Sequence, residues 1–134
     1  MALCEKQRQI TQTTGSGVKE TSLLFKALSE DARLRIMKML EVRPLTVSEI
    51  QYVLKGSQPN VSHHLKTLTD AGLVEHQRDG LWIVYRIANP GEDQLKAAML
   101  SLLRRLLKND PLVIDDRAVI KGVDRMNISV SPKR

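Results

Sequence analysis

One short stretch of the chain combines closely spaced polar side chains with a narrow apolar stripe. Residues 57–68 have the sequence Ser-Gln-Pro-Asn-Val-Ser-His-His-Leu-Lys-Thr-Leu. With about 100° between successive residues of a helix, its apolar members share one side; they are Val61, Leu65 and Leu68. Ser62, His63 and Lys66 then lie on the opposite side. Hydroxyl, imidazole and ammonium groups suit hydrogen bonds to base edges and phosphates in a DNA major groove.

The flanking sequence favours this chemistry over an ordinary solvent-exposed helix. Ser57 is a favourable N-cap residue, and Pro59 falls in the first turn, where its missing N–H costs nothing. Upstream, Thr46 and Glu49 have the spacing of a capping box, which predicts another short helix before Gly56. Two short helices joined by a tight turn that contains glycine predict a helix-turn-helix.

A β-hairpin is predicted directly after the second of these helices. Two β-like runs, 73–78 and 81–87, have Asp79-Gly80 between them, and Asp-Gly is a strong signal for a tight turn. A helix-turn-helix followed by a hairpin predicts a winged helix-turn-helix, a mostly α-helical fold with a small β-hairpin. Arg78 then lies at the tip of the wing.

Apolar periodicity predicts further helices on both sides of this region. One spans 18–28, another ends near Glu41, and a long last helix is predicted to begin at Asn89-Pro90 and to reach about residue 108. The last helix carries more apolar surface than a small domain needs, so we expect a homodimer held mainly by this helix, with help from the first. The expected interface residues are Leu23, Leu95, Met99, Leu102, Leu103 and Leu106.

The composition divides the chain into three parts. Residues 1–17 are polar and predict a flexible N-terminal arm. Residues 18–108 form the winged helix-turn-helix domain with its dimerisation helices. Residues 109–134 are expected to form a C-terminal extension that is partly helical or disordered, with a helix over 112–125.

The charge points to an acidic partner, although not at the expected recognition element. The chain has 134 residues, enough for one domain, and a formal net charge of +6, which suggests a partner such as nucleic acid. Within residues 58–89, however, the basic and acidic side chains cancel; they are Lys66, Arg78 and Arg86 against Asp70, Glu75 and Asp79. The surplus lies elsewhere, for example at Arg33, Arg35, Lys38, Arg43, Arg104, Arg105 and Lys108.

Several functional classes are disfavoured. Cys4 is the single cysteine, no apolar run has transmembrane length, and the N-terminus lacks the apolar core of a signal peptide. We therefore expect a cytoplasmic protein with no membrane partner. The chain shows no phosphate-binding loop and no nucleophile beside a base, so we expect no enzyme activity and no cofactor.

The same residues resemble a known family. The run Ser57–Lys66, followed by 71–74, Gly80, Trp82 and 85–86, is similar to the ArsR/SmtB family of winged-helix repressors. Residues 28–40 resemble the second helix of that family, and the likeness covers roughly residues 18–108. It implies a dimeric repressor that binds a palindromic operator in double-stranded DNA and dissociates when an inducer binds. The residues that it places at DNA, with Asn60 from the same run, are Ser57, Gln58, Asn60, Ser62, His63, Lys66, Arg78 and Gly80.

The usual inducer site of the family is absent from the sequence. Arsenite and cadmium sensors of this kind carry Cys-x-Cys where this chain has Thr46 and Ser48, and zinc sensors carry histidine along the last helix, which here has none. Neutral hydroxyls are poor ligands for these ions. We therefore expect no metal site at Thr46–Ser48 and release from DNA by a small organic inducer, or by none. Cys4 is the weak alternative, through an atypical arsenic or metal site.

Two further alternatives remain open at this point. A winged helix also serves as a protein-interaction module, and the neutral charge of residues 58–89 suits that use. The polar outer side of the predicted recognition helix argues against it, because protein-binding surfaces usually present apolar or aromatic anchors. His63 and His64 are adjacent and point about 100° apart, so they suit DNA contact and helix packing, respectively, better than chelation of one ion.

Overall fold

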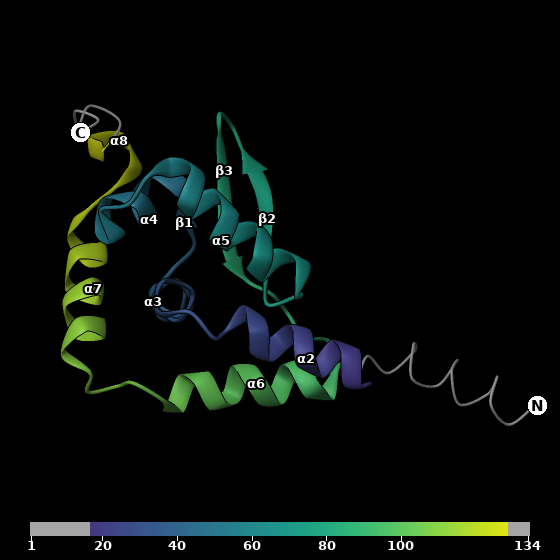
Figure 1. The fold of residues 1–134 in the computed structure, drawn as a ribbon. Coiled ribbons are helices and arrows are strands. Elements are labelled where there is room, and N and C mark those ends of the chain that lie inside the picture. Colours follow the sequence, from purple (N-terminus) through teal and green to yellow (C-terminus); the bar gives the residue numbers. More distant parts are fainter. Residues whose placement is uncertain (1–16, 129–134) are drawn as a thin grey trace, which may run out of the picture.

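The computed structural model describes residues 17–128, which form a helical body from which a β-hairpin projects (Figure 1). The expected flexible arm, apart from Gly17, lies outside the described residues, as do Cys4 and the chain beyond residue 128. In chain order the helices and strands are α2 (Val18–Ala27), α3 (Asp31–Leu40), β1 (Leu45–Thr46), α4 (Val47–Leu54), α5 (Gln58–Asp70), β2 (Val74–Asp79), β3 (Trp82–Ile87), α6 (Gln94–Arg105), α7 (Pro111–Gly122) and α8 (Arg125–Ile128). Within residues 17–128, no helix has the length and apolar character needed to cross a membrane.

Helix α3 is the centre of the core. Its side chains Ile36, Met37 and Met39 are fully buried, and it packs against α4, α5, α6, α7 and β3. The aliphatic residues around it form one continuous cluster, which includes Leu24 of α2 and Leu103 of α6. The near-absence of aromatic residues therefore does not prevent a closed core, because leucine, isoleucine, valine and methionine fill it.

The predicted helix-turn-helix is present as α4 and α5. Thr46 caps α4: its hydroxyl accepts a hydrogen bond from the backbone N–H of Glu49 (3.3 Å), and its own N–H donates to the Glu49 carboxylate (2.8 Å). Helix α4 ends at Leu54, and the next residue, Lys55, has a left-handed φ of 57° that turns the chain. Ser57 then caps α5 by accepting from the N–H of Asn60 (3.2 Å). Both helix starts are as predicted, because local capping signals determine them.

The wing belongs to a three-stranded antiparallel sheet of order β1-β3-β2, one strand more than predicted. The extra strand, β1, pairs Leu45 with Tyr85 and Thr46 with Val84. Asp79 pairs with Trp82, so the turn consists of Gly80 and Leu81, one residue later than expected. Gly80 has a φ of 65°, which suits the first turn position of a two-residue hairpin.

Helix α6 begins later and ends earlier than predicted. Asn89 and Pro90 do not start it; the Asn89 side chain instead accepts from the N–H of Gly91 (3.0 Å) in a turn. Asp93 is the true N-cap and accepts from the N–H of Lys96 (3.0 Å). The helix ends at Arg105, because Leu107 adopts a left-handed φ of 64°. Two N-cap signals compete in this stretch, and the later one is used.

The segment beyond residue 108 forms two helices that pack on the body. Helix α7 lies against α3 and α4, and its Ile120 is fully buried in the main core. Helix α8 lies beside α4 (Figure 1). The expected helix over 112–125 is therefore present as α7 with slightly different bounds.

Candidate nucleic-acid interface

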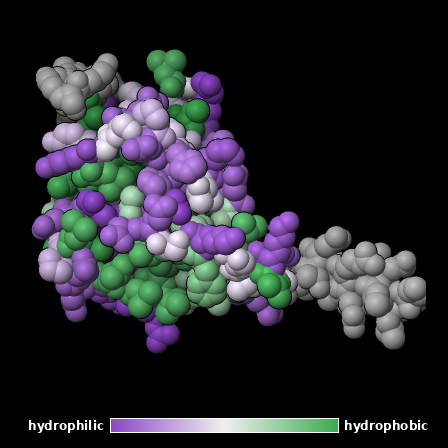
Figure 2. All heavy atoms as spheres, in the orientation of Figure 1, coloured by the Kyte–Doolittle hydropathy of each residue, from purple (hydrophilic) through white to green (hydrophobic). Residues whose placement is uncertain are grey.

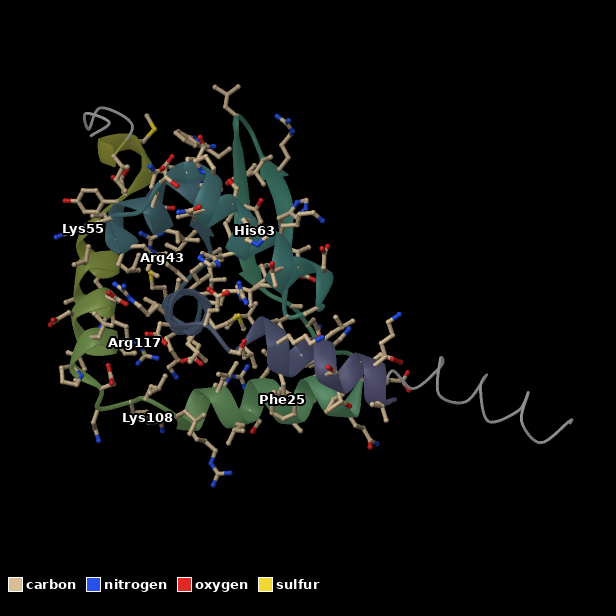
Figure 3. The ribbon with its side chains drawn as sticks, viewed as in Figure 1. Phe25, Arg43, Lys55, His63, Lys108 and Arg117 are labelled. Atoms are coloured by element: carbon tan, nitrogen blue, oxygen red, sulfur yellow. The ribbon has the colours of Figure 1, made fainter. Side chains whose placement is uncertain are left out.

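Helix α5 separates an apolar buried side from a polar exposed side. Val61, Leu65 and Leu68 are at most 1% exposed and anchor the helix to the core. His63 and Lys66 are exposed on the opposite side, and Ser62 is half-buried between them. Figure 3 marks the position of His63 on α5. The first turn is exposed as well, with Ser57, Gln58 and Asn60 at the solvent surface.

The wing tip places a second group of predicted residues in solvent. Arg78 and Gly80 are both exposed, and the Arg78 guanidinium donates only a long hydrogen bond to the Gly80 carbonyl (3.4 Å). Within residues 17–128, Arg78 has no carboxylate partner, so its charge is available to a phosphate. Leu81 at the same tip is 94% exposed.

Ion pairs neutralise most of the other charge on this face. Lys66 of α5 pairs with Asp70 (2.9 Å), and Arg86 pairs with Glu75 directly across the hairpin (2.9 Å). All four side chains are well exposed, so a phosphate competes for the two cations at little cost. Within residues 58–89, Lys66 and Arg86 are therefore held in weak surface ion pairs. Arg78 has no carboxylate partner among residues 17–128.

Four of the basic side chains outside residues 58–89 form hydrogen bonds or ion pairs within the protein. Arg33 donates to the carbonyls of Lys26 and Ala27 at the end of α2. Lys38 is 1% exposed and donates to the Leu103 carbonyl (2.6 Å). The guanidinium groups of two more arginines, Arg35 and Arg43, pair with buried carboxylates. These cations hold helices together, so the net charge of the chain overstates its attraction for nucleic acid.

His64 links α5 to the body. Its Nδ1 lies 3.1 Å from a guanidinium nitrogen of Arg33, so the neutral ring acts as the acceptor. Burial lowers the pKa of His64, and the positive charge of Arg33 lowers it further. The packing role expected for His64 is consistent with this contact. His76, for which the sequence indicates no partner, lies beside Tyr85 across the hairpin, with ring centroids 5.3 Å apart.

The residues expected at the dimer interface occupy two kinds of position. Leu23, Leu102 and Leu106 are 43–47% exposed, whereas Met99 and Leu103 are buried inside the same chain. Leu95 is half-buried. Figure 2 shows apolar side chains gathered on the lower part of the visible face, where α6 runs. The stripe of α6 thus serves the core of its own chain and leaves a second apolar surface uncovered.

The start of α4 places Thr46 in its capping box. The Thr46 hydroxyl and N–H are both engaged with Glu49, and Thr46 is 2% exposed. Across residues 17–128, no three histidine, cysteine or acidic side chains lie close enough together to hold a metal ion. Cys4 lies outside this part of the chain.

One residue of this surface has no signal in the local sequence. Arg125 of α8 reaches the wing, where its guanidinium lies 3.6 Å from the Asp79 carboxylate and 5.9 Å from the ring centre of Trp82. The two contacts join segments more than forty residues apart. No pattern of residue spacing indicates them.

The fold and the exposed side of α5 together define a winged helix-turn-helix of the DNA-binding class. The comparisons agree: residues 30–76 match the family described as bacterial regulatory protein, arsR family. The chain is 40% identical to the arsenic resistance transcriptional regulator ArsR1 of Pseudomonas putida over 80 residues, which cover 58% of this chain and 61% of ArsR1. It is 36% identical over 93 residues to Rv0081 of Mycobacterium tuberculosis, described as an uncharacterized HTH-type transcriptional regulator, over 69% of this chain and 82% of Rv0081.

A solved structure shows the same architecture. The homodimeric winged helix-turn-helix DNA-binding domain Mb0332 of Mycobacterium bovis superposes with a TM-score of 0.55 at 27% identity, over 68% of this chain and 84% of that one. The chain belongs to the ArsR family of transcriptional regulators. It is a DNA-binding regulator and not an enzyme, as the sequence predicts.

Proposed function

We propose that the protein is a sequence-specific repressor that binds a palindromic operator in double-stranded DNA as a homodimer. The observation that carries this proposal is the exposed polar side of α5, whose opposite apolar side is fully buried. It lies next to a wing whose Arg78 has no carboxylate partner among residues 17–128. A helix of this kind lies in the major groove while the wing contacts the neighbouring backbone or minor groove. His63 and Ser62 are suited to base edges, and Arg78 to phosphate.

Binding to the DNA upstream of the protein's own gene tests the proposal. Fluorescence anisotropy with a labelled upstream fragment is compared with a scrambled fragment of equal length, at several salt concentrations. We expect operator binding that is at least about 10³-fold tighter than binding to the scrambled fragment. Equal affinity for the two fragments would refute sequence-specific repression at this site.

One observation favours a second function, a protein-interaction module. Leu81 is 94% exposed at the wing tip, and Ile83 on β3 is 42% exposed. Exposed apolar residues of this kind are suited to a protein partner. Replacing Leu81 by Ser separates the two functions, because DNA binding through α5 and Arg78 survives the change, whereas a protein contact anchored by Leu81 does not.

The homodimer is the second part of the proposal. Leu102 and Leu106 at the end of α6, together with Leu23 of α2, leave apolar surface exposed that a second copy would bury. A two-fold dimer also places two recognition helices about 34 Å apart, one turn of DNA. The Mb0332 domain, with the same fold, is homodimeric.

Sedimentation tests the dimer. Leu102→Glu with Leu106→Glu should give folded monomers at micromolar concentration, because a buried interface does not accept two carboxylates. Leu81→Glu is the matched control, since it makes the same exchange at an exposed leucine of the wing, and it should leave the dimer intact. A monomeric wild-type protein would contradict this part of the proposal.

We further propose that release from DNA does not use a metal at the start of α4. The Thr46 hydroxyl is already committed to the capping box. A small organic inducer at the dimer interface, or no inducer, is expected instead. Titration of the DNA complex with zinc, cadmium and arsenite, for wild type and Cys4→Ser, tests this. Release of the wild type alone at micromolar concentration would assign sensing to Cys4.

A further inference from the structure

The outer half of the wing lacks support from the sheet. Strand β1 pairs only with Tyr85 and Val84, so the residue pairs nearer the tip, Arg78 with Ile83 and Asp79 with Trp82, form a two-stranded ribbon. An isolated two-stranded hairpin is only marginally stable in water. Something outside the sheet is needed to hold the tip in one orientation.

Arg125 contacts both members of the last residue pair. Its guanidinium lies 3.6 Å from a carboxylate oxygen of Asp79 and 5.9 Å from the centre of the Trp82 ring, within cation–π range. Asp79 itself is 71% exposed at its side chain, whereas the Arg125 side chain is only 25% exposed. Arg125 is thus the more buried member of the contact, and Asp79 is the more exposed one.

The segment that carries Arg125 is tied to the helix-turn-helix. Arg43 donates to the carbonyls of Ile120 (3.1 Å) and Val123 (2.7 Å), the second only two residues before Arg125. The same arginine pairs with Glu49 (2.9 Å), which closes the capping box of α4. A continuous set of polar contacts therefore runs from the first turn of α4 through Arg43 to the chain just before α8.

The contact also changes the charge at the tip. Arg78 and Asp79 are neighbours, so without a further cation the carboxylate of Asp79 offsets the attraction of Arg78 for a phosphate. Arg125 compensates Asp79 and leaves the tip with a net positive charge. Through both the orientation and the charge of the wing tip, Arg125 would favour binding of Arg78 to a phosphate.

We infer that Arg125 is a positioning residue for DNA binding: it clamps the Asp79–Trp82 pair to the body and so holds Arg78 where the wing meets DNA. The inference rests on the proposed DNA-binding function. The clamp itself exists without DNA. Its presence can therefore be measured separately from its effect on affinity.

Tryptophan fluorescence can measure whether the clamp is present, because Trp82 is the single tryptophan of the chain. In Arg125→Gln, acrylamide should quench Trp82 fluorescence more strongly than in wild type, in protein free of DNA. Lys121→Gln is the matched control, because it removes the same charge from an exposed position at the end of α7. Arg125→Lys keeps the charge without the planar group and should recover part of the wild-type quenching. Equal quenching in wild type and Arg125→Gln would refute the clamp.

Affinity for operator DNA then tests the effect of the clamp on DNA binding. Arg125→Gln should weaken binding about two- to fivefold, the range expected for one exposed ion pair, and Lys121→Gln should change it less than twofold. In an Asp79→Asn background the loss caused by Arg125→Gln should shrink, because the partner is already missing. An equal loss in both backgrounds would show that Arg125 does not act through its ion pair with Asp79 and would overturn the inference. If wild type binds no DNA, the proposed function fails, while the quenching result still decides the clamp.

Discussion

Two regions of this protein hold ion pairs that differ in burial. At the α3–α7 interface, Arg35 makes two hydrogen bonds of 2.8 Å to Asp116, and Glu41 accepts from both Lys38 (2.8 Å) and Arg117 (2.7 Å). Lys38 and Asp116 are 1% and 4% exposed. On the proposed DNA-facing surface, formed by the outer side of α5 and by the wing, Lys66 and Asp70 are 71% and 65% exposed at their side chains.

Burial decides what each pair does. An exposed pair contributes at most about 1 kcal/mol and exchanges its partner easily, so it suits a surface that must bind a ligand. Removing one member of a buried pair leaves an uncompensated charge, which costs several times more. The basic residues of α3 therefore stabilise the fold, while Lys66 and Arg86 on α5 and the wing form only exposed ion pairs, which suits the DNA contact proposed for this surface. In Figure 3, Arg43 and Arg117 lie among the helices of the body.

Removing one partner of a buried ion pair should have the largest effect on the free energy of unfolding. Asp116→Ala removes the bidentate partner of Arg35, whose pKa is raised chiefly by the hydrogen bond to Asp116. We expect a loss of about 3 kcal/mol in the free energy of unfolding, measured by urea denaturation. Asp70→Ala, the same exchange in the exposed region, should cost less than about 1 kcal/mol. Similar losses for the two variants would remove the distinction between the regions.

Changes on the DNA-facing surface should affect binding and leave stability almost unchanged. His63→Ala should cost about 1–3 kcal/mol on operator DNA and little on random DNA, if the imidazole contacts a base edge. Arg78→Ala should weaken binding to every sequence and lower the salt dependence by about one phosphate contact per subunit. Anisotropy titrations over a salt series measure both effects. Equal losses on operator and random DNA for His63→Ala would exclude base recognition by His63.

Releasing an exposed cation should strengthen binding slightly. Asp70→Asn removes the partner of Lys66 and a negative charge from the outer side of α5. We expect affinity for any DNA to rise by less than about 1 kcal/mol, with a steeper salt dependence. Asp115→Asn removes the same charge from an exposed position of α7 and should have no such effect. A rise of similar size in both variants would show that only net charge matters.

His64 of α5 contacts Arg33 of α3. We expect its protonation to have a small effect on stability, which replacing His64 should remove. Because burial lowers its pKa below the ordinary 6.5, the unfolded chain takes up the proton first as the pH falls. Stability from this group is therefore present above pH 6.5 and is lost progressively below it. Between about pH 7.5 and pH 5.5, the Tm of wild type should fall more steeply than that of His64→Gln. Parallel pH profiles would contradict the lowered pKa of His64.

The local elements were predictable because their signals lie within a few residues. The Thr46–Glu49 capping box, the Ser57 N-cap and the Asp-Gly hairpin signal each involve neighbours in the chain, and all three correctly predict the element that follows. The start of α6 was wrong, because Asn89 and Asp93 are both acceptable N-caps and local sequence does not rank them. Strand β1 was missed, since a two-residue strand is defined only by its partner, about forty residues away.

The sequence by itself determined which side of α5 is apolar, and with it the class of the protein, because helical periodicity and capping are properties of adjacent residues. Which basic residues are free was decided only by the tertiary structure. Arg35 finds Asp116 at a separation of 81 residues, and Arg125 reaches Asp79 from the other end of the domain. Coulombic and hydrogen-bonding partners depend on distance in space, and only the packing of α7 and α8 on the body brings these groups together.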